Sequence, residues 1–204
     1  LGLNLPDYRK IIANLLKPFT DVAEKNPYAQ FPKSLKKEFI ANFSDENFPL
    51  CEPYSKWMVA QDAVNQGAAV VMTSIGNAVK HGIPEDQWIF LKSYADCDEL
   101  RVIQRPDISR SPAQKTALLH ALDYSGLAIK DITYFDLYSC FPIAVWTACE
   151  YLELKTDGSV PLTVTGGLPY FGGPGNNYVM HSIKQMMDKV RAKPGSHGLV
   201  TANG

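Results

Sequence analysis

The feature that most constrains the fold is an alternation of short apolar runs with helix-compatible segments, which begins near Tyr54 and continues to the C-terminus. The apolar runs have the length of buried strands and lie at residues 68–72, 88–94, 132–137, 162–165 and 199–202. The helix-compatible segments between them lie at residues 55–66, 74–81, 112–124, 142–152 and 176–191. This alternation predicts a layered α/β domain with a mostly parallel or mixed sheet.

Local signals define several of these helices more closely. Ser111 followed by Pro112 is a good helix start, because serine caps the free amides and proline is tolerated at the first helical position. Gly126 and Gly82 are expected to stop the helices before them. Before residue 55, frequent prolines predict that no long helix forms, with a helix only around residues 7–16.

Composition excludes several classes of function. The net charge is −1, so there is no basic surface of the kind that binds nucleic acid. The four cysteines form no C-x-x-C pair and suggest no metal site; they read as free thiols, which fits a cytoplasmic location. No apolar run reaches the roughly 20 residues that a membrane-spanning helix needs. The first residue is not methionine and the last segment is strand-like, so we expect a piece of a longer chain.

One loop that could carry chemistry spans residues 136–142, where a strand passes into a helix. In open α/β sheets, sites form at the carboxyl ends of strands. Cys140 in this loop could be a nucleophile activated by the helix N-terminus. The alternative is a small buried thiol at a strand–helix junction.

A second loop spans residues 165–177 and has five glycines between Gly166 and Gly175. It leads into a helix whose N-terminal amides can hold an anion or a developing oxyanion. Its glycine spacing matches neither a P-loop nor a dinucleotide-binding loop. The alternative is a tight turn capped by Asn176. His181, in the helix that follows, is either a general base or a structural helical histidine.

Taken together, five segments resemble the thiolase superfamily, in particular the acetyl-CoA acetyltransferases and sterol-carrier-protein-type thiolases. Residues 26–31 read Asn-Pro-Tyr-Ala-Gln-Phe, where the family has Asn-Pro-Tyr-Ser-Gln-Phe, and residues 65–69 read Asn-Gln-Gly-Ala-Ala, where it has Asn-Asp-Gly-Ala-Ala. Residues 138–141 read Tyr-Ser-Cys-Phe, where it has Asn-Glu-Ala-Phe or His-Asp-Cys-Phe. Residues 166–174 resemble Gly-Gly-Leu, three residues, then Gly-His-Pro, and residues 200–204 fall at the final Cys-x-Gly-Gly strand end.

The resemblance implies C–C bond cleavage or Claisen condensation on acyl-CoA, with no covalently bound cofactor and no metal. In the family, a cysteine of the N-terminal half carries the acyl group, the Gly-His-Pro histidine activates it, and a C-terminal cysteine acts as acid/base. Here Gly173 stands at the position of that histidine, Tyr138 at that of the Asn or His, and Ala202 at that of the cysteine. General acid–base groups contribute about 10²–10⁴-fold, so ordinary thiolysis is not expected of these residues.

We therefore predict a thiolase-like αβα domain with a mixed sheet at residues 55–204, preceded by part of a loop domain at residues 1–54. The predicted function is that of an acyl-CoA acyltransferase that is inactive as this portion alone; the alternative is a non-catalytic acyl-CoA or lipid binding protein. The expected partners are acyl-CoA, a second copy through the absent N-terminal half, and a small partner subunit. The expected catalytic residues are Tyr138, Cys140 and His181. The expected residues around CoA are Asp62, Phe141, Gly172, Gly173, Pro174, Gly175 and Asn176. The basic run at residues 33–37 is either a solvated face or a site for CoA phosphates.

Overall fold

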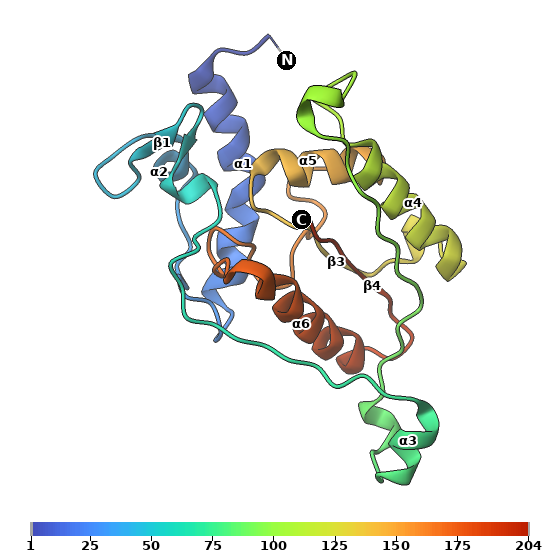
Figure 1. Cartoon of the computed structure of the whole chain (residues 1–204). Helices are drawn as coiled ribbons and strands as arrows, with labels where there is room; N and C mark the ends of the chain where they lie inside the picture. Colours follow the sequence, from blue (N-terminus) through green and yellow to red (C-terminus); the bar gives the residue numbers. More distant parts are fainter. Residues whose placement is uncertain (1, 204) are drawn as a thin grey trace.

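The computed structural model describes residues 2–203 and combines six α-helices with two small sheets (Figure 1). The helices are α1 (Leu5–Glu24), α2 (Lys37–Ala41), α3 (Ile75–Lys80), α4 (Pro112–Ser125), α5 (Pro142–Tyr151) and α6 (Tyr178–Ala192). The strands are β1 (Pro49–Cys51), β2 (Tyr54–Ser55), β3 (Tyr134–Asp136) and β4 (Gly198–Val200). Strands β1 and β2 pair antiparallel, and β3 and β4 pair parallel.

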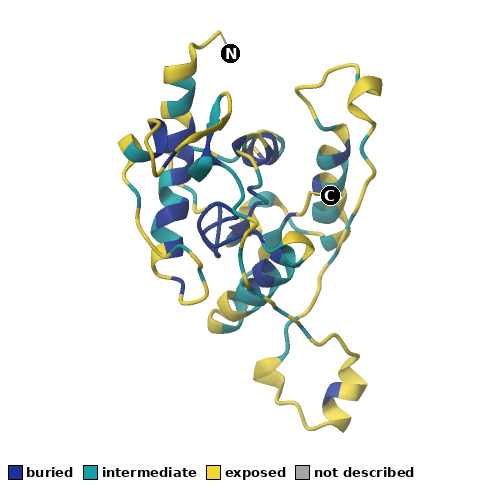
Figure 2. Cartoon of the chain, turned by 60° about the vertical axis from the view of Figure 1, so that its left-hand side comes forward, coloured by how far each residue is buried: buried dark blue, intermediate teal, exposed yellow. Residues whose placement is uncertain are grey.

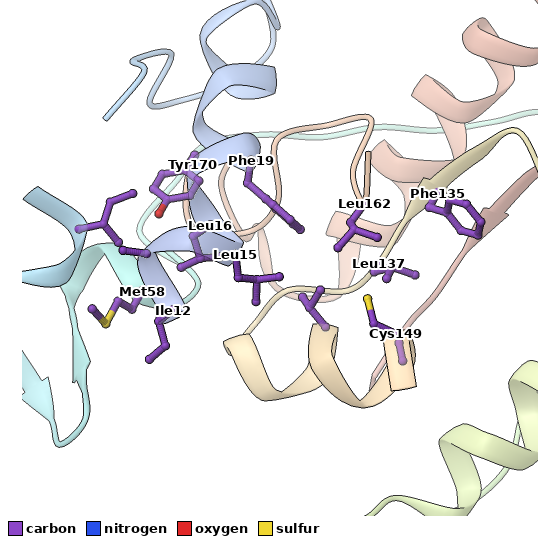
Figure 3. Close-up of a cluster of buried hydrophobic side chains, with 14 of the residues drawn as sticks. Ile12, Leu15, Leu16, Phe19, Met58, Phe135, Leu137, Cys149, Leu162 and Tyr170 are labelled. Carbon is purple, nitrogen blue, oxygen red and sulfur yellow. The ribbon is translucent and has the colours of Figure 1, made fainter. Parts of the chain in front are cut away.

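The parallel pair β3–β4 forms the middle of a three-layer arrangement. Side chains alternate along β3, as the period of a strand requires. Phe135 and Leu137 enter a core that also contains Cys149 of α5 (Figure 3), whereas Asp136 points the other way and binds Ser182 of α6. Helices α4 and α5 thus lie on one side of the strands and α6 on the other (Figure 1), which confirms the predicted layered α/β fold.

Helix α1 supplies one wall of the core and is longer than predicted. It runs for 20 residues and contains Pro18, so the expectation that prolines confine this helix to residues 7–16 is wrong. An interior proline costs about 3 kcal/mol or more. Burying one leucine or phenylalanine contributes about 1.5–3 kcal/mol, and Leu15, Leu16 and Phe19 are all at most 2% exposed (Figure 3). Packing of this face therefore outweighs the proline.

Residues 55–66 were expected to be helical, and this prediction is wrong. Only a short 3₁₀ turn, Lys56–Met58, forms there, and the backbone is then extended. The reason is that the amides bond to distant loops instead of to their own carbonyls. The Ala60 amide donates to the Cys140 carbonyl at 3.0 Å, and the Gln61 amide donates to the Leu168 carbonyl at 3.2 Å.

Two of the expected strands lie on either side of α3, in a segment that stands away from the other layers with α3 at its far end (Figures 1 and 2). We call this segment, residues 68–94, the arm. Residues 68–72 and 88–94 form no strand, contrary to prediction. Val71 is 91% exposed and Met72 is 79% exposed. Their apolar pattern is that of buried strands, but within residues 2–203 Val71 and Met72 remain uncovered.

Residues 162–165 also form no regular strand, although one was predicted. The Leu137 amide donates to the Leu162 carbonyl at 3.0 Å, so this segment does begin to run beside β3. The amides of Val164 and Thr165 then donate to the Asp136 carboxylate rather than to a strand carbonyl. A side chain therefore replaces the backbone ladder.

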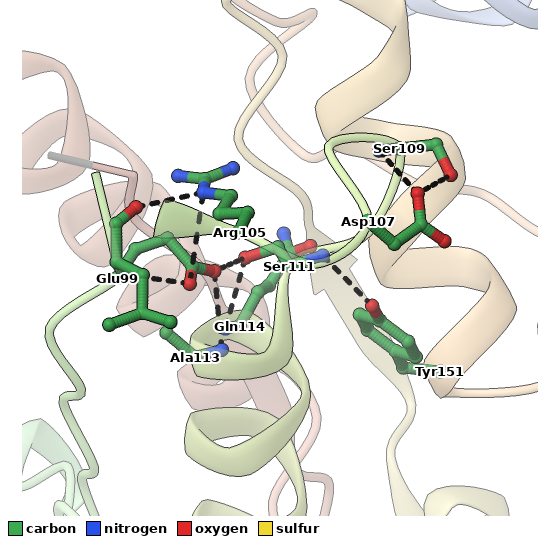
Figure 4. A network of polar contacts seen from close by, with 9 residues as sticks. Glu99, Arg105, Asp107, Ser109, Ser111, Ala113, Gln114 and Tyr151 are labelled. Carbon is green, nitrogen blue, oxygen red and sulfur yellow. Dashed lines mark hydrogen bonds and ion pairs between the residues drawn. The ribbon is translucent and has the colours of Figure 1, made fainter. Parts of the chain in front are cut away.

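Helices with clear end signals are confirmed, within one or two residues. In α4, the Ser111 hydroxyl accepts a hydrogen bond from the Gln114 amide at 3.3 Å, and Gly126 ends the helix with a φ of 68°. Figure 4 shows a second contribution: Glu99 accepts hydrogen bonds from the Ser111 hydroxyl at 2.6 Å and from the Ala113 amide at 3.3 Å. A carboxylate at this position also complements the helix dipole.

One cluster of buried side chains includes residues from both predicted domains, such as Ile12 and Ile40 on one side and Val145 and Tyr170 on the other. The boundary between residues 54 and 55 stays a prediction. No helix in the part of the chain that the structure describes is long and apolar enough to cross a membrane.

The difference between core and arm can be tested with two matched truncations. Leu16→Ala should lower the free energy of unfolding by about 2–5 kcal/mol, because Leu16 is 1% exposed. Val71→Ala should change it by less than about 0.5 kcal/mol, because Val71 is 91% exposed. Denaturant unfolding measures both; a loss at Val71 as large as that at Leu16 would contradict an exposed arm.

Candidate functional site

The candidate site is organised by Asp136, whose side chain is fully buried. Its Oδ2 atom accepts hydrogen bonds from the amides of Val164 at 2.8 Å and Thr165 at 3.1 Å. The same oxygen accepts from the hydroxyls of Thr163 at 2.9 Å and Thr165 at 3.0 Å. Burying a carboxylate is costly unless such donors replace water. Asp136 therefore holds the entry to the glycine-rich loop against β3.

The other oxygen of Asp136 reaches α6. Its Oδ1 atom accepts from Ser182 at 2.7 Å and from Tyr178 at 3.1 Å. Burial, and then the charge of Asp136, raise the pKa of Tyr178 well above its usual value, so its hydroxyl remains a donor. One carboxylate thus joins β3, the glycine-rich loop and the first turns of α6.

The first two glycines of the loop are required by close packing. Gly166 has a φ of 110°, and a Cβ atom there would lie 2.5 Å from the Ala23 Cβ of α1. Gly167 has a φ of 76°, and a Cβ atom there would lie 2.5 Å from Phe19 and 2.6 Å from the Ser139 hydroxyl. Both positions combine a left-handed backbone with no room for a side chain.

Three separate segments meet at the cysteine-bearing loop. The Leu168 amide donates to the Ser139 hydroxyl at 3.0 Å, which joins this loop to the glycine-rich loop. The Tyr138 amide donates to the Thr201 hydroxyl at 2.7 Å, which joins it to the chain just after β4. The cysteine-bearing loop and the glycine-rich loop therefore lie side by side.

The extended segment after the 3₁₀ turn closes the site from a further side. Ala60 binds the Cys140 carbonyl, and the Gln61 carbonyl accepts from the Gly173 amide at 2.7 Å. Tyr138, Cys140 and Ala60 pack against one small apolar cluster of Leu168, Phe171 and Tyr178. These side chains form one apolar cluster, which we call the apolar site, with two polar groups at its edge.

Those two groups are the Tyr138 hydroxyl and the Cys140 thiol, which are both half-buried. Burial raises the pKa of the Cys140 thiol; backbone hydrogen bonds at the start of α5 lower it, but to a smaller extent. The pKa is therefore raised, in the opposite direction to the activation that the helix N-terminus was expected to give. Burial, and then the neighbouring Cys140, raise the pKa of Tyr138 as well. Both groups stay protonated at neutral pH.

The second half of the glycine-rich loop is shaped by backbone contacts. Gly172 has a φ of 117°, and a Cβ atom there would lie 2.3 Å from the Gln66 side-chain oxygen. Gly173 is buried, and a Cβ atom there would point at Leu168 and Ala60, 3.3 and 3.4 Å away. Pro174, Gly175 and Asn176 follow at increasing exposure.

The cap expected from Asn176 does not form, because Asn177 occupies the position before α6 and its side chain makes no capping hydrogen bond to the helix. Asn177 precedes α6, and its side chain makes two hydrogen bonds with the backbone of Ala68, with the oxygen accepting at 2.8 Å and the nitrogen donating at 3.2 Å. The amide thereby fixes the start of the arm to the end of the loop. Asn176 itself is exposed.

His181 lies in the first turn of α6 and is 8% exposed. Its ring packs against Phe171 with 5.2 Å between ring centroids, and its Nε2 atom has no hydrogen-bond partner among residues 2–203. Burial lowers the pKa of His181, so the imidazole is neutral at pH 7. It forms no hydrogen bond with Tyr138 or Cys140 in the described part of the chain.

Two further predicted residues directly follow residues of the site in the sequence. Phe141 is 45% exposed and packs on Tyr54, with 5.4 Å between ring centroids. Asp62 is exposed and follows Gln61, which bonds to both ends of the glycine-rich loop. Within residues 2–203, no group of three or more His, Cys, Asp or Glu side chains is placed to hold a metal ion.

Sequence reasoning did not select Asp136, Ser139, Asn177 or Thr201. The only local signal for Asp136 is an acidic residue inside an otherwise apolar strand. Its partners lie 27–46 residues away, and the Tyr138–Thr201 contact spans 63 residues.

Replacing Asp136 by asparagine should destabilise the protein. An amide offers a single acceptor oxygen, so at least two buried donors lose their partner, at about 1–3 kcal/mol each. We expect a loss of about 2–6 kcal/mol in a denaturant titration. Asp123→Asn, an exposed change on α4, is the matched control and should shift the free energy by less than about 0.5 kcal/mol. Equal, small effects of both changes would show that the hydrogen bonds around Asp136 do not hold the fold.

The lowered pKa of His181 predicts a pH dependence of stability. The folded chain favours the neutral imidazole, so below the ordinary value of 6.5 the unfolded chain binds more protons. This contribution is complete above pH 6.5 and is lost as the pH falls below it. Denaturation at pH 7 and pH 5 should show a smaller decrease for His181→Gln than for the unchanged chain. An identical decrease in both proteins would rule out His181 as the cause.

Sequence comparison links the chain to a group of enzymes. No family model matches it. It is 28% identical over 122 residues to an acetyl-CoA acetyltransferase of Methanocaldococcus jannaschii, which covers 59% of this chain and 30% of that protein. It is 26% identical over 172 residues to an acetyl-CoA acetyltransferase of Methanothermobacter thermautotrophicus, which covers 74% of this chain and 42% of that protein. The chain thus spans less than half the length of the curated relatives it matches.

Solved structures give the same direction. An SCP2-thiolase-like protein of Mycobacterium smegmatis, a monomer, is 46% identical with a TM-score of 0.94, and the match covers 100% of this chain and 45% of that one. The Ltp2-ChsH2(DUF35) aldolase shares the fold at 16% identity, with a TM-score of 0.65 over 96% of this chain and 55% of that one. The chain is therefore a relative of the thiolase superfamily with a thiolase-like α/β fold.

Proposed function

We propose that this chain is the C-terminal portion of a thiolase-like acyl-CoA acyltransferase, which forms or cleaves a C–C bond next to a thioester. The observation that carries the proposal is the meeting of three segments at Tyr138 and Cys140: the cysteine-bearing loop, the glycine-rich loop and the end of β4. The same three segments bear the motifs that resemble thiolases. The names of the curated relatives support acetyl-CoA as a substrate.

The chemistry of the apolar site favours stabilisation of negative charge over nucleophilic attack. Tyr138 and Cys140 are neutral donors beside apolar walls, where a hydrogen bond is stronger than in water. Such donors can stabilise the oxyanion that develops on a thioester carbonyl. A protonated thiol is a poor nucleophile, so the acyl-carrying group would come from another part of the protein. In this proposal two stretches flank the pantetheine chain. One is the extended segment at residues 59–62, and the other is residues 172–176 of the glycine-rich loop.

His181 is the proposed base in place of the residue replaced by Gly173. Its neutral imidazole has a free acceptor nitrogen, which supports this role. His181 contacts Phe171 rather than Tyr138 or Cys140. A water or the substrate would therefore have to link it to those two groups.

The chain alone is proposed to be inactive, and its exposed arm supports the need for more polypeptide. Val71 and Met72 in the arm are 91% and 79% exposed, and Ile103 and Ile108 before α4 are 94% and 71% exposed, which is unusual for large apolar side chains. We propose that the remainder of a longer thiolase-like chain, its second copy, or a small partner subunit covers them. The aldolase relative, in which a thiolase-fold chain is combined with a DUF35 protein, supports the last of these.

A binding protein without chemistry is the second candidate. Gly173 and Ala202 cannot transfer protons, which favours this reading. The apolar site and its two donors, Tyr138 and Cys140, would then hold the thioester of an acyl-CoA without reacting with it.

Substitution of Tyr138 separates the two candidates. In the full-length protein, Tyr138→Phe should lower kcat for acetoacetyl-CoA cleavage by about 10²–10³-fold and leave KM nearly unchanged, because it removes one oxyanion donor. Tyr134→Phe, at a half-buried tyrosine of β3 four residues earlier, is the control and should keep full activity.

Titration calorimetry with CoA decides the remaining outcomes. Cys140→Leu should place a larger side chain in the apolar site and weaken CoA binding at least about tenfold. Binding that depends on Cys140 without any turnover would support the binding protein. Absence of CoA binding to the full-length protein would reject both candidates.

A further inference from the structure

A cavity of about 290 Å³ lies beside the glycine-rich loop. It is lined by Phe31 and Trp57, with Lys33, Leu35 and Lys56 around them, and behind these lies Tyr170, which is itself fully buried. This is close to the lower end of the size range of small-molecule sites. We call these six residues the aromatic pocket.

The walls of the aromatic pocket are rigid. Phe31 meets Trp57 edge-on with 5.1 Å between ring centroids, and Trp57 stacks on Tyr170 at 6.4 Å with an interplanar angle of 13°. The Tyr170 hydroxyl donates to the Trp57 carbonyl at 2.8 Å, and the Trp57 indole donates to the Glu46 carbonyl at 3.0 Å. The polar atoms of the rings are therefore occupied, and an apolar surface faces the cavity.

The rim of the pocket is positively charged. The Lys56 ammonium lies 4.9 Å from the Trp57 ring centroid, a cation–π distance that keeps it beside the opening. Lys33 is exposed, and its amide donates to the Phe31 carbonyl at 2.8 Å, which bends the chain around the pocket. Neither lysine forms an ion pair with a carboxylate within residues 2–203.

We propose that the aromatic pocket binds a small organic acid with a flat or branched apolar body, whose carboxylate lies between Lys33 and Lys56. Apolar walls favour the body of such a ligand, and two free ammonium groups favour an anion. An organic cation would also suit three aromatic rings, but the two lysines repel it. A ligand with several polar edges would leave them unpaired against the rings.

The pocket and the apolar site are built from neighbouring residues. Tyr170 lies behind the pocket, and Phe171, the next residue, packs against Tyr178 in the apolar site. The Phe31 amide donates to the Tyr170 carbonyl at 3.1 Å, and the Gln30 amide donates to the Phe171 carbonyl at 2.9 Å. The binding proposal does not rest on the acyl-CoA function, because it uses a separate cavity.

The test uses 3-phenylpropionate as the probe and follows the indole NMR signal of Trp57, assigned with Trp57→Phe. The probe should shift this signal in a saturable way, and the neutral analogue 3-phenylpropanol should bind at least about threefold more weakly. Lys33→Met and Lys56→Met should each weaken binding of the acid about three- to fivefold while leaving binding of the alcohol unchanged. Lys37→Met, an exposed lysine of the same basic run, is the matched control and should change neither.

Two results would overturn the proposal. One is equal affinity for the acid and the alcohol in the unchanged protein. The other is a shift that occurs at Trp88 or Trp146 and not at Trp57. All measurements are made without CoA, so failure of the acyl-CoA proposal leaves this outcome unaffected.

Discussion

The buried carboxylate of Asp136 is the contact on which the rest of the structure depends. Four donors on one oxygen and two on the other come from residues 163–165 and from α6, which are separate parts of the chain. A short two-stranded sheet would hold the glycine-rich loop only weakly through its backbone. Because every donor around Asp136 is directed at one point, displacement of any segment would leave a buried polar group without a partner.

The apolar site takes its properties from this arrangement. Asp136 and Leu137 precede Tyr138, so the strand that orders the carboxylate also delivers the tyrosine and the cysteine to the edge of the sheet. The walls are apolar because Asp136 has drawn the polar groups of Thr165, Tyr178 and Ser182 to itself. Tyr138 and Cys140, at the edge, keep their protons because burial among apolar side chains disfavours their charged forms.

What the sequence revealed about the fold followed the range of the interactions involved. Helix α4 was predictable because Ser111, Pro112 and Gly126 act within a few residues of the ends they define. The extended course of residues 59–61 was not, because its partners, Cys140 and Leu168, lie about 80 to 107 residues further along. An apolar run such as residues 68–72 has the same pattern whether the covering surface belongs to the described residues or to other polypeptide. In the site, motif positions found Tyr138 and Cys140, whereas the direction of their pKa shifts needed the surrounding walls.

The close approach of Gly166 to Ala23 has a consequence for how such a protein can change over evolutionary time. Neither position has space for another carbon atom, and the two lie 143 residues apart in the printed sequence. A larger residue at either one would push α1 away from the loop, and no adjustment at the other can compensate, because both are already at or near the smallest side chain available. Related proteins should therefore keep the same two residues at this pair of positions, whereas residues on the outer face of α1 remain free to vary.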